Sequence, residues 1–140
     1  MLALAPLLAV TVIAVAAVAL RAGQARQRRH LVGHVVGVSA ERPSILYFSG
    51  AACTVCHTAQ RPALERLAPE LEGRVEVREI DVAEQPALAR SFKVMSLPTT
   101  VVVDAGGRAR AVNAGFASAA LLRTQLRDAG LLPVAEGSAA

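Results

Sequence analysis

The sequence is poor in aromatic side chains: it has no Trp, and Phe, Trp and Tyr together make up 3% of its 140 residues. A hydrophobic core must therefore be built from Val, Leu, Ile and Ala. There are only two Cys, which excludes a disulfide-stabilised miniprotein, because such scaffolds need several bridges. Hydrophobic residues still make up 54% of the chain, which argues against intrinsic disorder. The length indicates one small domain with additional segments.

Acidic residues are absent from residues 1–40, which carry four Arg. Residues 41–140 contain 11 basic and 11 acidic side chains and are formally neutral. The net charge of +4 and the pI near 10 therefore come from one short segment. A basic patch spread over the domain is not indicated, so we expect no nucleic-acid partner.

Charged residues are also absent from Leu2 to Leu20, a run of 19 residues that are Leu, Ala, Val and Ile except for Pro6 and Thr11. As a helix rising about 1.5 Å per residue, this run approaches the roughly 30 Å core of a bilayer. It predicts a transmembrane anchor over residues 1–21, in contact with the membrane through residues 2–20. The Arg cluster that follows places the rest of the chain in the cytoplasm by the positive-inside rule. A cleaved signal peptide and a buried core helix are the alternatives.

The rest of the chain divides into a basic juxtamembrane linker over residues 22–43, a folded domain over 44–132 and a flexible tail over 133–140. Within the linker, residues 31–38 are either a short strand or an irregular lead-in. The hydrophobic periodicity of the domain predicts strands over 44–49, 74–82, 99–103 and 108–112, and helices over 54–71, from 86 to 90 or 92, and from Ser118. In the last helix we expect Leu121, Leu122 and Leu126 to face the core.

The order of these elements predicts the fold class. A strand, a helix and a strand come first, which implies parallel pairing with a right-handed crossover. The turn at residues 104–107 then joins two strands as a hairpin, which adds antiparallel pairing. We therefore expect an α/β fold with a mixed central sheet flanked by helices, preceded by the N-terminal transmembrane helix.

The most informative motif is Cys53-Thr54-Val55-Cys56, a C-x-x-C at the junction between a strand and a helix. Free backbone N–H groups and the positive dipole end at the start of a helix favour a thiolate at Cys53. Cys56 lies nearly one turn further along, close enough for the two sulfurs to bond. One exposed thiol attacks a disulfide and the other resolves the mixed disulfide, which is dithiol–disulfide exchange.

Residues 44–130 resemble the thioredoxin-like proteins. The resemblance depends on the run at residues 45–48, the C-x-x-C, Pro62 in the following helix, Ile80-Asp81, the segment 94–100, Gly106-Gly107 and Gly115. In that family the proline at the place of Pro98 is cis and faces the active-site disulfide. The resemblance therefore implies a thioredoxin-like fold in which Pro98 packs beside Cys53. It also implies that the backbone of Leu97 pairs with an extended substrate peptide.

The sequence departs from the family pattern around the cysteines. Ala52 stands where the family usually has Trp, Thr54-Val55 replaces the frequent Gly-Pro, and Pro62 falls about one position later than usual. Many thioredoxins carry a buried Asp at the place of Tyr47, paired with a Lys at the place of Glu79. That proton-transfer pair is absent here in its usual form.

Glu79 and His57 are candidate auxiliary residues. Burial of Glu79 under the active site would raise its pKa toward neutrality and suit it to deprotonate Cys56, with Tyr47 as a hydrogen-bond partner. Alternatively, Glu79 reaches solvent at the end of its strand. His57 shares a helical face with Cys53 and, as imidazolium, would stabilise its thiolate; the alternative is an exposed histidine with little effect.

The motif allows three other interpretations. Cys53 to His57 also fits the C-x-x-C-H pattern of haem c attachment, with Met95 as a distal ligand. The position of the motif between a strand and a helix of a βαβ unit argues against this interpretation. Two Cys and one His do not supply a four-ligand zinc site at the usual spacing, so we expect no metal. A non-catalytic module that tethers a partner is the third alternative.

We therefore predict a membrane-anchored thiol–disulfide oxidoreductase that exchanges the Cys53/Cys56 pair with protein disulfides. No cofactor is expected beyond the redox-active disulfide itself. A single-pass protein whose redox domain faces the cytoplasm would act as a reductase in cell redox homeostasis, supplied by a thiol or reductase electron donor. With the opposite topology, it would be an exported interchange protein that matures secreted or haem proteins.

Overall fold

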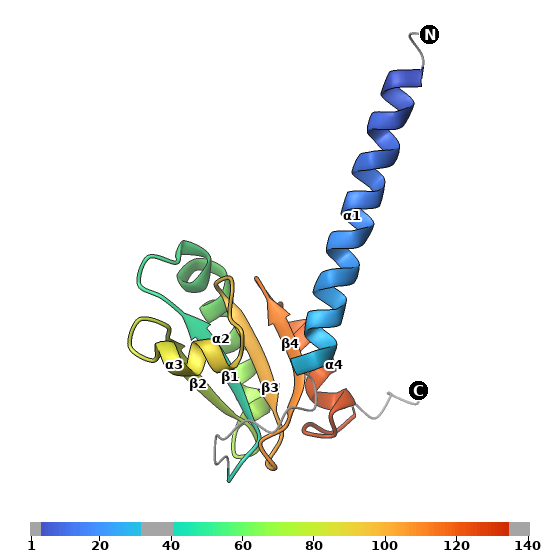
Figure 1. The fold of residues 1–140 in the computed structure, drawn as a ribbon. Helices are drawn as coiled ribbons and strands as arrows, with labels where there is room; N and C mark the ends of the chain where they lie inside the picture. Colours follow the sequence, from blue (N-terminus) through green and yellow to red (C-terminus); the bar gives the residue numbers. More distant parts are fainter. Residues whose placement is uncertain (1–3, 32–40, 135–140) are drawn as a thin grey trace. The chain divides into compact units, whose positions relative to one another are not determined.

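The computed structural model describes residues 4–31 and 41–134, with side chains described for residues 9–22 and 41–134. The chain divides into two compact units, the first ending at Leu31 and the second beginning at Val32. The first unit contains one helix, and the second contains all of the described strands (Figure 1).

Helix α1 (Leu4–Leu31) covers the long apolar run of the sequence. Its described side chains, at residues 9–22, are all exposed. Among the residues that the structure describes, no helix has both the length and the apolarity that crossing a membrane requires. The transmembrane anchor predicted for residues 2–20 is therefore not supported. Most of residues 31–38 and of the predicted tail lie outside the described residues.

The second unit has the element order that the sequence predicts. Its elements are β1 (Ser44–Ser49), η1 (Cys56–Gln60), α2 (Arg61–Leu71), β2 (Glu76–Asp81), α3 (Pro86–Ser91), β3 (Thr99–Val103), β4 (Ala109–Ala114) and α4 (Ala119–Asp128). Ser118 caps α4 as expected, since its side chain accepts a hydrogen bond from the Leu121 N–H. The predicted bounds of the fourth strand were wrong, because pairing with β3 continues to Ala114.

The four described strands form one mixed sheet in the order β2-β1-β3-β4. β1 pairs in parallel with β2 and antiparallel with β3, and β3 and β4 form the predicted hairpin. In the parallel pair Tyr47 lies opposite Glu79, so both side chains project from the same face. The mixed sheet expected from the sequence is confirmed.

Helices cover both faces of this sheet. On one face, side chains of α2 and α4 pack on Ile45, Tyr47 and Val102 in a cluster that also contains Cys56. On the other face, Ala89 of α3 and Phe92 pack on Phe48 and Ile80. The Phe48 and Phe92 rings lie 5.4 Å apart between centroids, in a tilted arrangement that favours their contact. The cysteine-bearing helix is thus anchored on a core of mainly aliphatic side chains.

Two apolar side chains of β2 and α4 are exposed, and one of them, Leu121, was expected to face the core. Val77 is on β2, which lies at an edge of the described sheet, so its side chain is only partly covered. Leu121 is exposed because the buried stripe of α4 runs through Leu122 and Leu126, which lie one turn apart. The expected inward position of Leu121 was wrong.

The helix that carries the cysteines is interrupted by a π-helical segment, η1. The Arg61 N–H donates to the Cys56 carbonyl, five residues earlier, in place of the usual four. Pro62 follows at the start of α2 and has no N–H to continue the α-helical pattern. The interruption of the helix therefore takes the form of a wider turn just before Pro62. This turn accommodates Pro62, which falls about one position later than the corresponding proline usually does in the thioredoxin-like proteins.

Candidate active site

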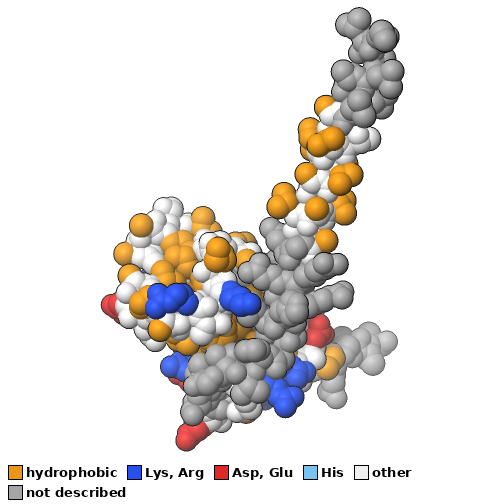
Figure 2. Space-filling view, viewed as in Figure 1, with side chains coloured by type: hydrophobic (Ala, Val, Ile, Leu, Met, Phe, Trp, Pro, Cys, Tyr) orange, Lys and Arg blue, Asp and Glu red, His pale blue; other side chains and the backbone are white. Residues whose placement is uncertain are grey.

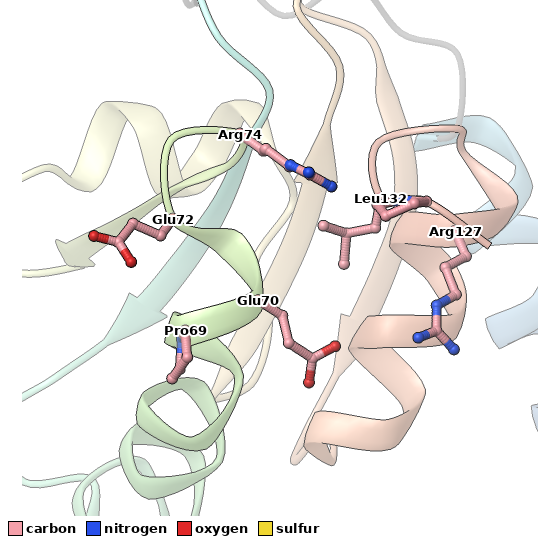
Figure 3. Close-up of a pocket in the computed structure, with 7 residues that line it drawn as sticks. Pro69, Glu70, Glu72, Arg74, Arg127 and Leu132 are labelled. Atoms are coloured by element: carbon pink, nitrogen blue, oxygen red, sulfur yellow. The ribbon is translucent and has the colours of Figure 1, made fainter. Parts of the chain in front are cut away.

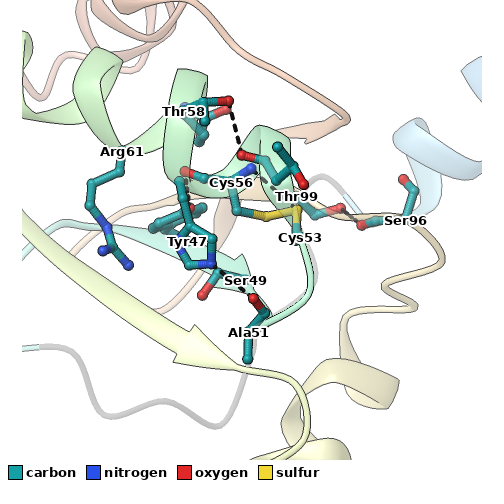
Figure 4. The surroundings of a disulfide bond; sticks show 12 residues. Tyr47, Ser49, Ala51, Cys53, Cys56, Thr58, Arg61, Ser96 and Thr99 are labelled. Carbon is teal, nitrogen blue, oxygen red and sulfur yellow. Dashed lines mark hydrogen bonds between the residues drawn. A yellow bond between two sulfur atoms is a disulfide. The ribbon is translucent and has the colours of Figure 1, made fainter.

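Cys53 and Cys56 form a disulfide at the junction between the β1 loop and the helix (Figure 4). Their Cα atoms are 5.3 Å apart. The Cys53 N–H donates to the Gly50 carbonyl, which closes the turn after β1 and sets the first cysteine at the helix start. The sequence prediction that the two sulfurs lie within bonding distance is confirmed.

The two cysteines differ in exposure. Cys56 is fully buried in the core cluster, whereas Cys53 is only partly buried and packs against that cluster. The Cys56 backbone N–H lies 3.2 Å from Cys53 Sγ and donates to it. An amide proton directed at this sulfur stabilises negative charge there, which favours a Cys53 thiolate when the pair is reduced.

The Leu97–Pro98 segment approaches the cysteine loop. The peptide bond between these residues is cis, as the resemblance implied. A methyl group added at Gly50, in the loop before Cys53, would meet Leu97 Cδ1 at 3.1 Å. Ser96 and Thr99, which flank the segment, are drawn beside the disulfide in Figure 4. The fold thus brings the Leu97–Pro98 motif next to the C-x-x-C motif.

Tyr47 contacts the second cysteine rather than Glu79. Its buried hydroxyl donates to the Cys56 carbonyl at 2.8 Å. Burial raises the pKa of the phenol, and the nearby Glu79 carboxylate raises it further, so Tyr47 stays protonated and remains a donor. The expected hydrogen bond between Tyr47 and Glu79 was wrong, because Glu79 has other partners.

Glu79 is not buried under the active site: its side chain is 42% exposed. Its Oε1 accepts hydrogen bonds from Ser49 Oγ at 2.8 Å and from Arg61 Nη2 at 2.7 Å. Partial burial raises the pKa of Glu79, but these two hydrogen bonds and the Arg61 charge outweigh it and lower the pKa overall. Of the two alternatives for Glu79, the buried carboxyl with a raised pKa was wrong and the carboxyl that reaches solvent agrees with the structure, because Glu79 lies on the edge strand and meets a cation.

His57 is exposed, and its Nε2 lies 3.3 Å from the Ala51 carbonyl oxygen. The described contact of its ring is therefore with the loop before Cys53 and not with a sulfur. Its predicted effect on the Cys53 thiolate stays a prediction. Among residues 9–22 and 41–134, no three His, Cys, Asp or Glu side chains gather in a way that would hold a metal ion.

Sequence reasoning missed one residue of the site, Gln60. Its side chain is fully buried and hydrogen-bonds the backbone of Ala117, 57 residues later in the chain. Only the late position of Pro62 hinted at an unusual helix here, and nothing in the sequence indicated the contact.

Apolar side chains are exposed on the segments that meet at the disulfide. They are Val55 within the motif, Met95 before Leu97, and Phe116 after β4. Figure 2 shows apolar side chains gathered at the end of the domain where the loop after β1 enters the helix. Such a surface suits contact with another polypeptide.

A separate cleft of about 530 Å³ lies at the opposite end of α2 (Figure 3). It is lined by Pro69, Glu70 and Glu72 at the end of α2, and by Arg74, Arg127, Leu132 and Pro133. Neither cysteine lines this cleft. Glu70 is also held by Arg123 of α4, whose guanidinium hydrogen bonds lower the pKa of that carboxyl. The cleft is therefore distinct from the disulfide site.

Curated relatives of the chain are thioredoxins. Over 86 residues it is 31% identical to a bifunctional thioredoxin reductase/thioredoxin of Mycobacterium leprae, covering 61% of this chain and 19% of that protein. Over 45 residues it is 42% identical to a thioredoxin of Staphylococcus aureus, covering 32% of this chain and 43% of that protein. The chain thus spans less than half the length of either relative.

Solved structures similar to this chain also include thioredoxins. A chloroplastic thioredoxin z matches with a TM-score of 0.55 and 34% identity, covering 64% of this chain and 80% of that one. Thioredoxin-2 of the malaria parasite matches with a TM-score of 0.58 and 26% identity, covering 62% and 82%. The family model described as Thioredoxin matches residues 34–127, which include the cysteine pair, the cis-proline and the βαβ unit. With fold, motif and relatives in agreement, the chain belongs to the thioredoxin family.

Proposed function

We propose that this protein is a thiol–disulfide oxidoreductase that reduces protein disulfides. The observation that carries the proposal is the Cys53–Cys56 pair at a helix start, with one cysteine only partly buried and the other fully buried. Exchange requires a sulfur that can reach a substrate and a second sulfur sheltered until the mixed disulfide has formed. The unequal burial of the two cysteines supports this division of roles.

The reaction proceeds in two exchanges. In the reduced protein, the Cys53 thiolate attacks one sulfur of the substrate disulfide, the substrate S–S bond breaks, and one substrate thiolate leaves. Cys56 then loses its proton and attacks Cys53 Sγ, which releases the second substrate thiolate and forms the Cys53–Cys56 disulfide. Two electrons pass to the substrate, and its two thiolates take up two protons. The Cys56 N–H at Cys53 Sγ supports the role of Cys53 as the attacking thiolate.

The substrate is a polypeptide in this proposal. Leu97 and Pro98 lie next to the cysteine loop and would hold an extended substrate segment, as the resemblance implied. The exposed side chains of Val55, Met95 and Phe116 add an apolar surface around this position. A protein chain with apolar side chains near its disulfide matches that surface better than a small charged disulfide does.

An electron donor must return the protein to its dithiol form after each cycle. One M. leprae relative is named a bifunctional thioredoxin reductase/thioredoxin, so a thioredoxin reductase is a reasonable donor class. A low-molecular-weight thiol is the other donor class. Either would attack the accessible sulfur of Cys53 and leave both cysteines reduced.

Single cysteine variants test this proposal. Cys56→Ser keeps the attacking thiol and lacks the resolving one, so it should accumulate mixed disulfides with its partners. Cys53→Ser should trap almost nothing and be inactive in the reduction of insulin by dithiothreitol. The double Cys→Ser variant is the matched control for background trapping. If Cys53→Ser were the better trap, the two roles would be reversed.

Insulin reduction by the wild-type chain separates an enzyme from a module that only tethers a partner. An enzyme accelerates insulin precipitation above the rate with dithiothreitol alone, and the double variant does not. Equal rates for wild type and double variant would reject the proposed activity.

A further inference from the structure

Gln60 forms an unusual link between the helix of the cysteines and a distant loop. It lies four residues after Cys56, within the π-helical segment, and its side chain is 0% exposed. Its Nε2 donates to the Ala117 carbonyl at 3.0 Å, and its Oε1 accepts from the Ala117 N–H at 2.9 Å. Both functional groups of the buried amide are therefore satisfied by one backbone residue.

The loop that Gln60 holds, residues 115–117, is fixed at its other end by the cis-proline segment. The Gly115 N–H donates to the Pro98 carbonyl at 2.7 Å. Gly115 has a φ of +91°, a conformation that favours glycine and turns the chain sharply after β4. The loop is thus tied to the two segments that flank the disulfide, and Ala117 is in the same buried cluster as Cys56.

Phe116 lies between these two attachments and is 50% exposed. Its neighbours in the chain are held by Pro98 on one side and by Gln60 on the other. An exposed aromatic side chain on a fixed backbone is a good contact for a partner, because little conformational entropy is lost when it binds.

We propose that Gln60 is a positioning residue that holds the 115–117 loop so that Phe116 presents an apolar contact to the polypeptide substrate. The inference rests on the proposed reductase function and assigns to Gln60 a role in selecting protein disulfides over small ones. Gln60 does not touch the reacting sulfurs in this proposal. It acts only through the position of Phe116.

The π-helical segment is what makes this link available. The wider turn places one additional residue between Cys56 and Pro62, and the side chain of Gln60 points into the interior from that turn. Removing the amide would leave the Ala117 N–H and carbonyl buried without these partners, so the loop would shift to find others. A displaced loop weakens the binding of a polypeptide but leaves the disulfide chemistry unchanged.

The test compares a protein disulfide with a small one. Gln60→Met keeps the size of the side chain and removes both hydrogen bonds. We expect its KM for insulin to rise about three- to tenfold with kcat nearly unchanged, since a contact made equally in the ground and transition states is lost. Its rate with the small disulfide dithionitrobenzoate should stay within about twofold of wild type, because that reaction does not use the loop.

Two further variants make the result decisive. Phe116→Ala removes the proposed contact from a half-exposed position that the fold tolerates, and it should raise the KM for insulin in the same way. Gln125→Met is the matched control: this amide also makes two hydrogen bonds, at 2.9 and 2.8 Å, but to the side chain of Asn113 in β4 and not to the 115–117 loop. Gln125→Met should lower stability and leave the KM for insulin at the wild-type value.

Each outcome has one meaning. A wild-type KM for insulin in either Gln60→Met or Phe116→Ala would overturn the inference. Equal losses with insulin and dithionitrobenzoate in Gln60→Met would also overturn it, because the amide would then act on the disulfide itself. A wild-type chain that reduces neither compound would instead reject the proposed function, and this inference with it.

Discussion

The Tyr47 hydroxyl connects the centre of the sheet to the second cysteine through one hydrogen bond. In Tyr47→Phe the ring still fills its place in the core, and the Cys56 carbonyl keeps its bond from the Arg61 N–H. No acceptor is left without a partner, so the loss should be near the low end for a buried hydrogen bond, about 1 kcal/mol in the free energy of unfolding. Denaturant unfolding of the oxidised protein measures it. Tyr47→Leu is the comparison, and it should be clearly less stable because the ring is also lost.

The Glu79 carboxylate gives the domain a defined dependence on pH. Its pKa is lowered in the folded protein, so the folded state holds fewer protons here than the unfolded chain near the ordinary carboxyl pKa of about 4.3. Its stabilising effect is present above that pH and is lost as the pH falls through the lower folded-state pKa. Glu79→Gln should therefore be less stable than wild type at pH 7, by under about 1 kcal/mol for so exposed a pair.

The difference between wild type and Glu79→Gln should shrink as the pH falls through the lowered pKa of Glu79 and disappear once that carboxyl is protonated, because both side chains are then neutral. Urea unfolding at a series of pH values measures it. Glu84→Gln is the control, since Glu84 is exposed and has no ion pair among the described residues. A difference that grew on acidification would contradict the assigned direction of the Glu79 pKa.

Glu79 is also expected to be dispensable for proton transfer. An ionised, exposed carboxylate held by Arg61 is a poor base for a buried thiol. Glu79→Gln should therefore release mixed disulfides at the wild-type rate, with an unchanged pH–rate profile. A shifted pH–rate profile would instead indicate that the Glu79 carboxylate takes part in proton transfer, as the sequence alone suggested.

The cysteine pair could be predicted from the sequence because its chemistry depends on local spacing, three residues at the start of a helix. The cis conformation of Pro98 was implied by the resemblance to the thioredoxin-like proteins, which depends in part on a similarly local motif. The partners of Tyr47, Glu79 and Gln60 could not be predicted, because each is set by an element distant in the chain. The sequence left both a buried and an exposed Glu79 open, and the choice depends on the position of β2 at an edge of the described sheet.

Among the elements, α3 ends at a position with an unusual backbone. Lys93 has a φ of +51°, and the N–H groups of Lys93 and Val94 close the helix end by donating to the Arg90 and Ala89 carbonyls. Glycine is preferred at this position of a helix end, because other residues are strained there. Lys93→Gly should stabilise the domain by about 0.5 to 1 kcal/mol, the strain relieved less the added entropy of the unfolded chain.

Thermal unfolding measures the effect of Lys93→Gly. Lys93→Ala is the control: it removes the same charge but keeps the strained conformation, so it should gain no stability. If Lys93→Gly were less stable than wild type, the lysine side chain would stabilise the folded domain by more than the strain at its backbone destabilises it.

The elements themselves were predictable where the pattern of apolar residues was long and regular. β1, β3 and α3 lie within a residue of their expected bounds, because β-branched runs and a proline at the helix start are strong local signals. η1 was not predicted, since a wide turn depends on how one additional residue is accommodated against the core. The predicted bounds of β4 were wrong for a related reason. Asn113 and Ala114 have low strand propensity, and pairing with β3 decides where the strand ends.

At the scale of the whole molecule, the location of the chain remains a prediction from charge alone. Were residues 2–20 to insert in a membrane, the four Arg and the absence of acidic residues among residues 1–40 should hold the redox domain inside the cell. A phosphatase that is active only after export, fused behind Ala140, should then be silent. Strong activity would favour the exported interchange protein, and a matched fusion to an intracellular reporter confirms that the chimera is made.

The wide turn after the cysteines also affects how this molecule is compared with other thioredoxins. An alignment that treats the helix as regular must open a one-residue gap between Cys56 and Pro62, or else misplace one of them. Homologues can therefore be sorted by whether the proline comes six residues after the second cysteine and is preceded by a glutamine two positions earlier. If the link to Ala117 has been selected, this insertion and the residue at the place of Phe116 should change together across the family.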